Sequence, residues 1–338
     1  LIKWIGSRDQ FDAAKGSMGL DDFKPVSLQG LTVVPAFTEC HTHLVFAGDR
    51  SNEFEMRNQG ASYQEIAKKG GGILSTVKAT REMSDEELLR LAQQRVDRFV
   101  SQGVTTVEVK SGYGLSHDEE IKMLRVAKSL NGPKIVTTFL GAHAIPPGRQ
   151  KDQYLEELVE KTLPAVAEQE LADRVDIFIE KGFFSVADGE RYLKAAKQLG
   201  FALTAHVEQL SHLGGAKLAA GFGAQCVDHV VEITDEDIRM LAQDEAPVCV
   251  LLPAADFYLK MAYPKARRLI DEGAVVALAT DFNPGSSPTQ SVNFVGVLAR
   301  LNMNMSLSEV LCSYIYGAAK ALGLQSERGS LSAGKVCD

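Results

Sequence analysis

Residues 84–109, SDEELLRLAQQRVDRFVSQGVTTVEV, contain one complete helix followed by one strand. Ser84 and Glu87 fit the Ser/Thr-x-x-Asp/Glu pattern, in which side chains bond the free N–H groups of a first helical turn. The apolar residues that follow recur at helical spacing until Gly103, a residue typical of helix ends. Val104–Val109 is then a continuous run rich in β-branched residues. The stretch predicts a helix beside a strand that is buried on both faces, as in a parallel sheet.

The same helix–strand unit recurs along the chain. Eight apolar runs predict strands, namely Leu31–Phe37, Val104–Val109, Lys134–Leu140, Val175–Ile179, Ala202–Ala205, Gln225–Val227, Val248–Leu252 and Val275–Ala279. The capping pattern opens helices at Ser84, Ser116, Ser185, Thr234 and Ser306, and glycines end several of them. Eight strands alternating with helices predict a (β/α)8 barrel over residues 31–320. A doubly wound sheet would need a glycine-rich phosphate loop after its first strand, and the sequence has none there.

The two ends of the chain fit the repeating pattern less well. Residues 1–30 lack the helix–strand pattern, and Gly-Lys-Val-Cys-Asp at 334–338 predicts the start of a further strand. We expect residues 1–30 and 321–338 to be remnants of a small β-rich second domain of a longer protein.

Composition excludes several classes of partner. The net charge of −8 argues against binding to nucleic acid or to an anionic membrane surface. No apolar run approaches the roughly 20 residues of a membrane span, and the first ten residues lack the apolar core of a signal peptide. The five cysteines form no C-x-x-C pair, which predicts a reducing, cytoplasmic location.

Histidines collect where predicted strands end, and the active site of a barrel lies at those ends. Five of the seven follow strands: His41, His43, His143, His206 and His229. His41 and His43 would point to one face of an extended segment. With His206 and Asp281, they would form a site of three nitrogens and one oxygen that suits Zn, Fe, Ni or Cu and leaves room for water. Such a metal lowers the pKa of bound water to about 7. Asp281 would be both ligand and base, and His229 would polarise a carbonyl or share the proton.

Longer motifs surround these residues. They are FTECHTHLVFAGDR at 37–50, GGGI at 70–73, KSGYG at 110–114, LGAHA at 140–144, LLP at 251–253 and ATDFNPGS at 279–286. The order H-x-H, His, His and Asp after strands one, five, six and eight resembles the amidohydrolase superfamily. The longer motifs resemble the imidazolonepropionase family within it, and this resemblance covers nearly the whole chain.

The resemblance implies hydrolysis of the ring amide of 4-imidazolone-5-propanoate to N-formimidoyl-glutamate in histidine degradation, with one Zn or Fe ion. It implies metal binding by His41, His43, His206 and Asp281, and proton handling by Asp281 and His229. The substrate contacts it implies are Arg50, Tyr63, Tyr113, His143, Gln209, Asn283, Gly285 and Ser286. The planar guanidinium of Arg50 suits the propionate carboxylate of this anionic substrate. His143 would donate to a ring nitrogen or carbonyl.

Two positions depart from relatives in the superfamily. Gln209 stands where many deaminases have a glutamate, and because Gln does not move a proton this favours the Asp281 and His229 pair. Glu180, rather than the adjacent Lys181, ends the fourth strand where binuclear relatives carry a carbamylated lysine, which favours one metal.

Alternatives remain at this level. One is another mononuclear amidohydrolase, either a deaminase or a hydantoinase-like cyclic amidase. Another is a non-catalytic binding protein on the same barrel, although the presence of all four ligands argues against it. The sequence leaves open Zn versus Fe, a homodimer such as many barrel hydrolases form, and whether residues 46–82 form a lid.

Overall fold

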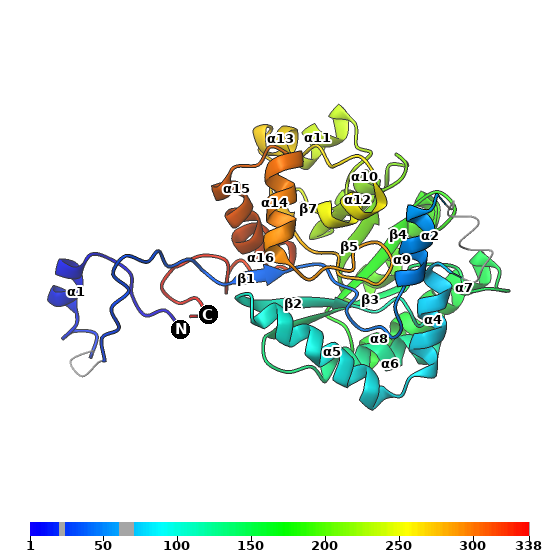
Figure 1. The fold of residues 1–338 in the computed structure, drawn as a ribbon, viewed down its shortest axis with the longest axis horizontal. Helices are drawn as coiled ribbons and strands as arrows, with labels where there is room; N and C mark the ends of the chain where they lie inside the picture. Colours follow the sequence, from blue (N-terminus) through cyan, green and yellow to red (C-terminus); the bar gives the residue numbers. More distant parts are fainter. Residues whose placement is uncertain (20–23, 61–70, 338) are drawn as a thin grey trace.

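The computed structural model contains eight parallel strands arranged as a barrel (Figure 1). The structure describes residues 1–19, 24–60 and 71–337. The strands are β1 (Phe37–Glu39), β2 (Val104–Lys110), β3 (Lys134–Ala142), β4 (Arg174–Ile179), β5 (Ala202–Val207), β6 (Cys226–His229), β7 (Val248–Leu251) and β8 (Val276–Leu278). Each strand pairs in parallel with the next in chain order. The predicted (β/α)8 barrel is confirmed.

The barrel closes between the segments that follow β1 and β8. Thr42 forms a parallel bridge with Phe282, and the N–H of His43 donates to the carbonyl of Phe282 at 3.0 Å. The buried Glu39 carboxylate accepts the N–H of Thr280, with both oxygens at 3.2 Å. These contacts join the first and last strands at the end of the barrel where the predicted site lies.

The chain forms helices that lie around the barrel, except the first, which lies in the N-terminal segment away from it (Figure 1). They are α1 (Arg8–Ala14), α2 (Ser51–Asn58), α4 (Ile73–Glu82), α5 (Asp85–Val100), α6 (His117–Lys128), α7 (Lys151–Glu157), α8 (Leu163–Glu168), α9 (Val186–Gln198), α10 (Gly215–Phe222), α11 (Asp235–Leu241), α12 (Pro253–Leu259), α13 (Ala266–Asp271), α14 (Val292–Asn302), α15 (Leu307–Cys312) and α16 (Ala318–Ala321), with π-helical turns η1 (Leu158–Thr162) and η2 (Ser313–Gly317). Helix α5 packs on β2, α6 on β3, and α9 on β4 and β5. Within the described residues, none of the helices has both the length and the hydropathy needed to cross a bilayer.

The capping pattern located the helix starts correctly. Five predicted residues occupy N-cap positions: Ser84, Ser116, Ser185, Thr234 and Ser306. All except Ser116 accept a hydrogen bond from a first-turn N–H with their side chain. This satisfies donors that would otherwise be lost at the helix start.

The first strand differs from its prediction. The structure places it at Phe37–Glu39, whereas residues 31–36 of the predicted Leu31–Phe37 are irregular. Leu31 is 70% exposed, and Pro35 has no N–H to offer a neighbouring strand. Pairing begins at Phe37, whose N–H donates to the carbonyl of Gly103 at 3.0 Å. The apolar run therefore overestimated the strand because only its last residue meets β2.

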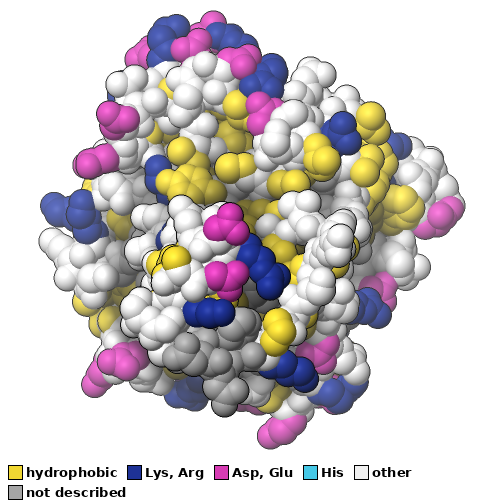
Figure 2. All heavy atoms as spheres, turned by 90° about the vertical axis from the view of Figure 1, so that its left-hand side faces the viewer, with side chains coloured by type: hydrophobic (Ala, Val, Ile, Leu, Met, Phe, Trp, Pro, Cys, Tyr) yellow, Lys and Arg dark blue, Asp and Glu magenta, His cyan; other side chains and the backbone are white. Residues whose placement is uncertain are grey.

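The two chain ends lie close together, outside the barrel (Figure 1). Ile2 N–H donates to Lys335 O, and Gly334 N–H donates to Ile2 O, both at 2.8 Å. Hydrophobic side chains are visible on the face of the molecule that carries these ends (Figure 2), and Val26 is 75% exposed. That these ends belong to a second, β-rich domain stays a prediction.

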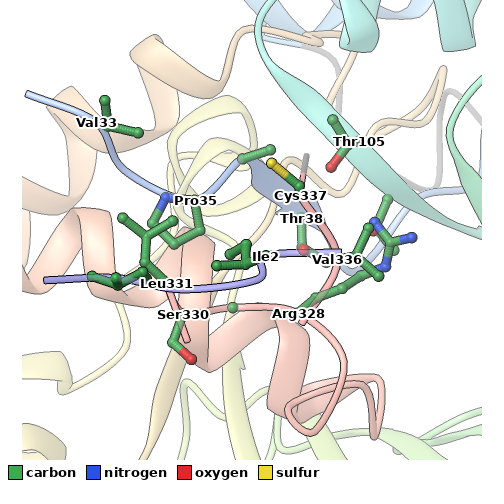
Figure 3. A pocket seen from close by; sticks show the side chains of 14 residues that line it. Ile2, Val33, Pro35, Thr38, Thr105, Arg328, Ser330, Leu331, Val336 and Cys337 are labelled. Carbon is green, nitrogen blue, oxygen red and sulfur yellow. The ribbon is translucent and has the colours of Figure 1, made fainter. Parts of the chain in front are cut away.

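A cavity of about 240 Å³ separates the two ends from the barrel (Figure 3). Aliphatic side chains such as Ile2, Pro35 and Leu331 line it, and Thr105 borders it from the N-terminal end of β2. The predicted histidine site follows the C-terminal ends of the strands, so this cavity is separate from it.

Asp256 is a buried carboxyl group in α12. Neither of its oxygens has a hydrogen-bond partner in the described part of the chain. Burial, reinforced by the charge of Asp281, raises its pKa to about 8. Because the folded state holds this proton more tightly than the unfolded state, stability falls as pH rises from the unfolded pKa toward the folded pKa.

We predict that replacing Asp256 by Asn flattens this pH dependence. Between pH 6 and pH 8 the metal-free wild type should lose about 2 to 3 kcal/mol more unfolding free energy than Asp256→Asn, since each pKa unit corresponds to about 1.4 kcal/mol. Urea denaturation at the two pH values measures the difference. Equal losses in both proteins would contradict the prediction.

Candidate metal centre and active site

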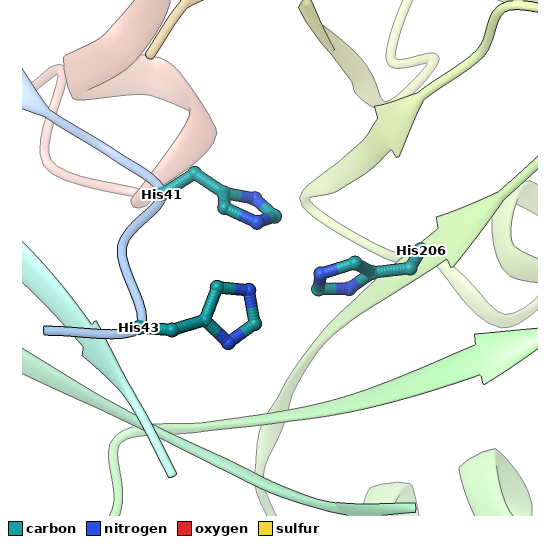
Figure 4. A group of neighbouring side chains, drawn as sticks. All are labelled: His41, His43 and His206. Atoms are coloured by element: carbon teal, nitrogen blue, oxygen red, sulfur yellow. The ribbon is translucent and has the colours of Figure 1, made fainter. Parts of the chain in front are cut away.

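His41 and His43 follow β1 on a segment whose backbone is held on both sides. Thr42, between them, pairs with Phe282, and its carbonyl accepts the N–H of Lys110 at 2.9 Å. Its hydroxyl donates to the carbonyl of Glu108 at 2.6 Å. Alternate side chains of such a segment share one face. The two imidazoles accordingly converge, as the H-x-H spacing predicts (Figure 4).

His206 of β5 and Asp281 beyond β8 complete the cluster. The ring centroid of His206 is 4.6 Å from that of His41 and 5.5 Å from that of His43. Oδ1 of Asp281 lies 3.3 Å from Nε2 of His41 and 3.4 Å from Nε2 of His43. One nitrogen from each of the three rings lies within 4.8 Å of the others. The structure thus brings together the four residues predicted as ligands.

Two buried carboxylates hold the outer nitrogens of these rings. Asp228 Oδ2 is 2.8 Å from His41 Nδ1, and Asp176 Oδ2 is 2.9 Å from His206 Nδ1. The contact with His41 is a hydrogen bond, which keeps the proton on Nδ1 and turns Nε2 toward a metal, whereas the contact with His206 is at ion-pair distance without hydrogen-bond geometry. Nε2 of His41 and of His206 is buried without a hydrogen bond to the described residues. Three imidazoles and one carboxylate with unpaired buried nitrogens fit a Zn or Fe ion.

Burial and neighbouring charges set the pKa values of the cluster. Burial lowers the pKa of His41, but the carboxylates of Asp228 and Asp281 outweigh it and raise that pKa to about 9. Burial lowers the pKa of His43 to about 4. Burial opposes ionisation of Asp281, but His41 and His43 hold its pKa well below the usual range. A metal must displace the proton of His41, so metal binding weakens as pH falls.

Asp281 and His229 share an unusual backbone conformation. Their φ angles are +51° and +75°, in the left-handed region that residues other than glycine rarely adopt. Strained residues of this kind cluster at functional sites. The His229 ring centroid is 5.3 Å from that of His206, and burial lowers the pKa of His229 to about 3. His229 is therefore neutral at pH 7.

A cavity of about 580 Å³ opens beside the cluster. The residues lining it include His43, Arg50, Arg57, Tyr113, His143, Phe178, Lys181, His206, Gln209, His229, Asp281, Asn283, Gly285 and Ser286. Its volume suits a small-molecule site. The structure brings every predicted substrate contact to this cavity except Tyr63, which lies outside the described residues.

Glu53 of α2 holds the guanidinium of Arg50. Its Oε2 accepts Nε of Arg50 at 2.9 Å and lies 2.8 Å from Nη2. Nη1 lies against Gly285, where a Cβ would come within 2.0 Å of it. A glycine at this position leaves the space that the guanidinium fills. Arg50 also lines the cavity beside the histidine cluster.

Asn283 shapes its own loop with its side chain. Its Nδ2 donates to the Asp281 carbonyl at 2.7 Å, and its Oδ1 accepts the N–H groups of Gly285 and Ser286 at 2.8 and 2.7 Å. The predicted direct contact of Asn283 with substrate stays a prediction. What the structure adds is that this amide fixes the backbone immediately after Asp281.

The Tyr113 loop is held by a buried carboxylate. Glu120 accepts N–H bonds from Gly112, Gly114 and Leu115 at 2.7 to 2.9 Å. His143 Nδ1 lies 3.0 Å from the Gly112 carbonyl, which accepts only, so Nδ1 carries the proton. Burial holds the pKa of His143 well below its usual range. Neutral His143 thus offers Nε2 as an acceptor, whereas the sequence suggested a donor.

The residues beside Gln209 have structural partners. Glu208 accepts four N–H groups, of residues 213–216, at 2.8 to 3.2 Å and so caps α10. Glu180 accepts the N–H groups of Leu210 and Ser211 at 2.8 and 3.3 Å. Both carboxylates are turned toward backbone, which leaves Gln209 as the member of this group that lines the cavity.

Sequence reasoning missed several residues around the site. Arg57 and Lys181 add positive charge to the cavity wall, and Asp176 and Asp228 hold the metal-facing imidazoles. Asp176 had a signal, because it interrupts the apolar run Val175–Ile179, whereas Asp228 directly follows the predicted strand Gln225–Val227. A buried charge at such a position requires a partner.

The amidohydrolase family model matches residues 32–338 of this chain. The chain belongs to the amidohydrolase family. It is 54% identical over 338 residues to an imidazolonepropionase of Bdellovibrio bacteriovorus, with 100% of this chain and 79% of that protein covered. It is 46% identical over 324 residues to an imidazolonepropionase of Symbiobacterium thermophilum, with 94% and 76% covered. These identities confirm the resemblance to imidazolonepropionases.

Solved structures share the fold at much lower identity. A 5-methylcytosine deaminase from Klebsiella pneumoniae has a TM-score of 0.69 at 13% identity, with 93% of this chain and 82% of that chain covered. A zinc-bound adenosine deaminase from Xanthomonas campestris has a TM-score of 0.62 at 16% identity, with 90% and 70% covered. At these identities the likeness establishes the barrel alone.

We predict that His41→Ala abolishes metal retention. Wild-type protein dialysed after purification should carry about one metal ion per chain, and the variant should carry almost none because a ligand is lost from the site. His212→Ala is the control, since His212 contacts Asp237 at 2.9 Å and its side chain is 44% exposed. Elemental analysis measures the content. Equal metal in the two variants would refute the assignment.

Proposed function

We propose that this chain is an imidazolonepropionase that hydrolyses 4-imidazolone-5-propanoate to N-formimidoyl-L-glutamate. The observation that carries the proposal is one cavity with a metal-ligand cluster on one wall and Arg50 on another. The cluster suits hydrolysis, and the guanidinium suits the propionate. The 54% identity to a curated imidazolonepropionase supports this substrate.

We assign the metal site to His41, His43, His206 and Asp281. When bound, Zn or Fe would supply Lewis-acid polarisation and a more acidic water. The cluster has the same donor set for either ion, and the choice between them is a matter of measurement.

Asp281 and His229 handle the protons. The net reaction adds water across the ring amide: the C–N bond breaks, the water oxygen becomes a carboxylate oxygen, and the nitrogen gains a proton. Asp281 is ionised and accepts a proton from water. Neutral His229 steadies the carbonyl oxygen or passes the proton toward the leaving nitrogen.

The remaining cavity residues orient the substrate. Arg50 binds the propionate through its guanidinium, and Tyr113 presents its hydroxyl from the loop that Glu120 holds. His143 accepts a ring N–H at Nε2, and Gln209 bonds the imidazolone ring. Tyr63, Asn283, Gly285 and Ser286 complete the proposed contacts, with Asn283 and Gly285 acting also through the loop geometry described above.

Other members of the superfamily are weaker candidates. A deaminase that moves protons through a glutamate would need that glutamate where this chain has Gln209. The neighbouring Glu208 cannot replace it, because its carboxylate caps α10. Glu180, whose carboxylate bonds backbone N–H groups, argues against a binuclear amidohydrolase. A mononuclear hydantoinase-like cyclic amidase is the alternative that the substrate's carboxylate separates, because Arg50 should select an anionic substrate. A non-catalytic protein would not need a complete ligand set.

A cytoplasmic location and a homodimer remain expectations. All five cysteines are free, and Cys40, Cys226 and Cys249 are buried. Free thiols agree with a reducing compartment. The charge of −8 disfavours nucleic acid as a partner and also repels the anionic substrate, so capture depends on the metal and on local groups such as Arg50.

Metal removal and restoration test the function. Chelated protein should leave freshly prepared 4-imidazolone-5-propanoate unchanged, and Zn or Fe should restore its disappearance with formation of N-formimidoyl-L-glutamate, followed by absorbance and mass spectrometry. A fully metal-loaded protein that leaves this compound unchanged would refute the proposal.

We predict that Arg50→Ala raises KM roughly 10- to 100-fold with a smaller change in kcat, because a charged hydrogen bond to the propionate is lost. Arg125→Ala, which removes an exposed contact with Gln169, should leave KM unchanged. Steady-state kinetics with the substrate and with its neutral propionamide analogue measure the effect. If wild type and Arg50→Ala discriminate equally between the two compounds, Arg50 does not bind the carboxylate.

A further inference from the structure

Lys110 ends β2 with its ammonium fully buried inside the barrel. Its Nζ is 2.8 Å from Glu108 Oε1, 2.8 Å from Asp176 Oδ2 and 3.4 Å from Asp228 Oδ2. The side chain of Lys110 is 0% exposed, and its partners are 0 to 1% exposed. Burying a charge is costly unless it is paired, so the ammonium of Lys110 and its three carboxylates depend on one another to stay buried.

Two of these oxygens also contact the proposed metal ligands. Asp176 Oδ2 is the atom 2.9 Å from His206 Nδ1, and Asp228 Oδ2 is the atom 2.8 Å from His41 Nδ1. One ammonium is therefore linked through a single oxygen to each of two imidazoles that approach the same point from β5 and from the segment after β1.

A buried carboxylate has two oxygens that exchange by rotation unless its contacts fix them. The other oxygens, Oδ1 of Asp176 and of Asp228, have no partner among the described residues. The contacts of Oδ2 with Lys110 and with an imidazole thus define which oxygen faces the metal centre. Without the ammonium, both carboxylates lose a contact that orients them.

We propose that Lys110 is a positioning residue of the metal centre, acting through Asp176 and Asp228 to aim His206 and His41 at one ion. The proposal rests on the metal site assigned above. Lys110 does not line the cavity. It orients the imidazole rings of His206 and His41 from the barrel interior, through the two aspartates. Partners that orient ligand imidazoles typically contribute 10- to 100-fold in metal affinity or activity.

The chain supplies a matched control in Arg174 of β4. This second buried cation is 1% exposed and lies 3.1 Å from Cys226 Sγ through Nη2. Among the described residues, no hydrogen bond or ion pair joins it to Asp176, to His206 or to His41, although its charge acts on Asp228 through space. Removing it takes a buried cation out of the same barrel interior without breaking the contact of Asp228 with His41 or of Asp176 with His206.

The test measures Zn²⁺ affinity by competition with a chromophoric chelator. Lys110→Met should raise the dissociation constant roughly 10- to 100-fold, and Arg174→Met should change it less than about threefold at a similar loss of thermal stability. The visible spectrum of Co²⁺-loaded Lys110→Met should also shift, because the imidazoles are reoriented. A folded Lys110→Met with unchanged affinity and spectrum would overturn the proposal, as would equal losses in both variants.

A second pair of variants keeps the test decisive if Lys110→Met folds poorly. Asp228→Asn combined with Lys110→Met removes one charge of each sign, which eases folding. In the Asp228→Asn background, removing Lys110 should weaken Zn²⁺ binding by a smaller factor than in the wild type, since one of its two routes is gone. Fully additive effects would overturn the proposal. Zn²⁺ affinity is read without substrate, so failure of the proposed reaction is distinguishable from failure of this inference.

Discussion

The contacts between buried carboxylates and imidazoles are the constraint on which the rest of the site depends. Asp228 with His41 and Asp176 with His206 place ionisable groups deep inside a barrel whose other strand residues are largely apolar. An unpaired charge there would be prohibitive, so each group fixes its neighbour. The imidazoles of His41 and His206 are therefore oriented from the barrel interior before a metal ion or substrate binds.

Buried glutamates perform a related task at the mouth of the barrel. Glu120 holds the Tyr113 loop, Glu180 holds the loop after β5, and Glu208 caps α10. Glu53 accepts the Gly72 N–H at 2.8 Å as well as Arg50. Each carboxylate satisfies backbone or guanidinium donors that would otherwise be lost to burial. The loops that line the cavity are thus fixed by charge-assisted hydrogen bonds rather than by packing alone.

Local patterns explain how much of this could be predicted from the sequence. Alternating strands and caps such as Ser84 depend on residues near in the chain, and so does the convergence of His41 and His43. The link from Lys110 to Asp176 and Asp228 depends on the register of three strands, which no local pattern specifies. The approach of Arg50 to the backbone of Gly285 likewise joins distant segments and has no local signal, whereas its ion pair with Glu53 is a local i,i+3 contact.

Apolar character alone misled the prediction of the first strand. Residues 31–36 have the composition of a buried strand, but the barrel offers a partner only from Phe37 onward. Pairing partners and not propensity decide where such a strand begins.

The most direct measurement is a crystal structure of the metal-loaded protein with a carboxylate-bearing substrate analogue. We expect one ion bound by His41, His43, His206 and Asp281 at about 2.0 to 2.2 Å, with the analogue's carboxylate on Arg50. A second ion at the end of β4, or a carboxylate bound away from Arg50, would contradict it.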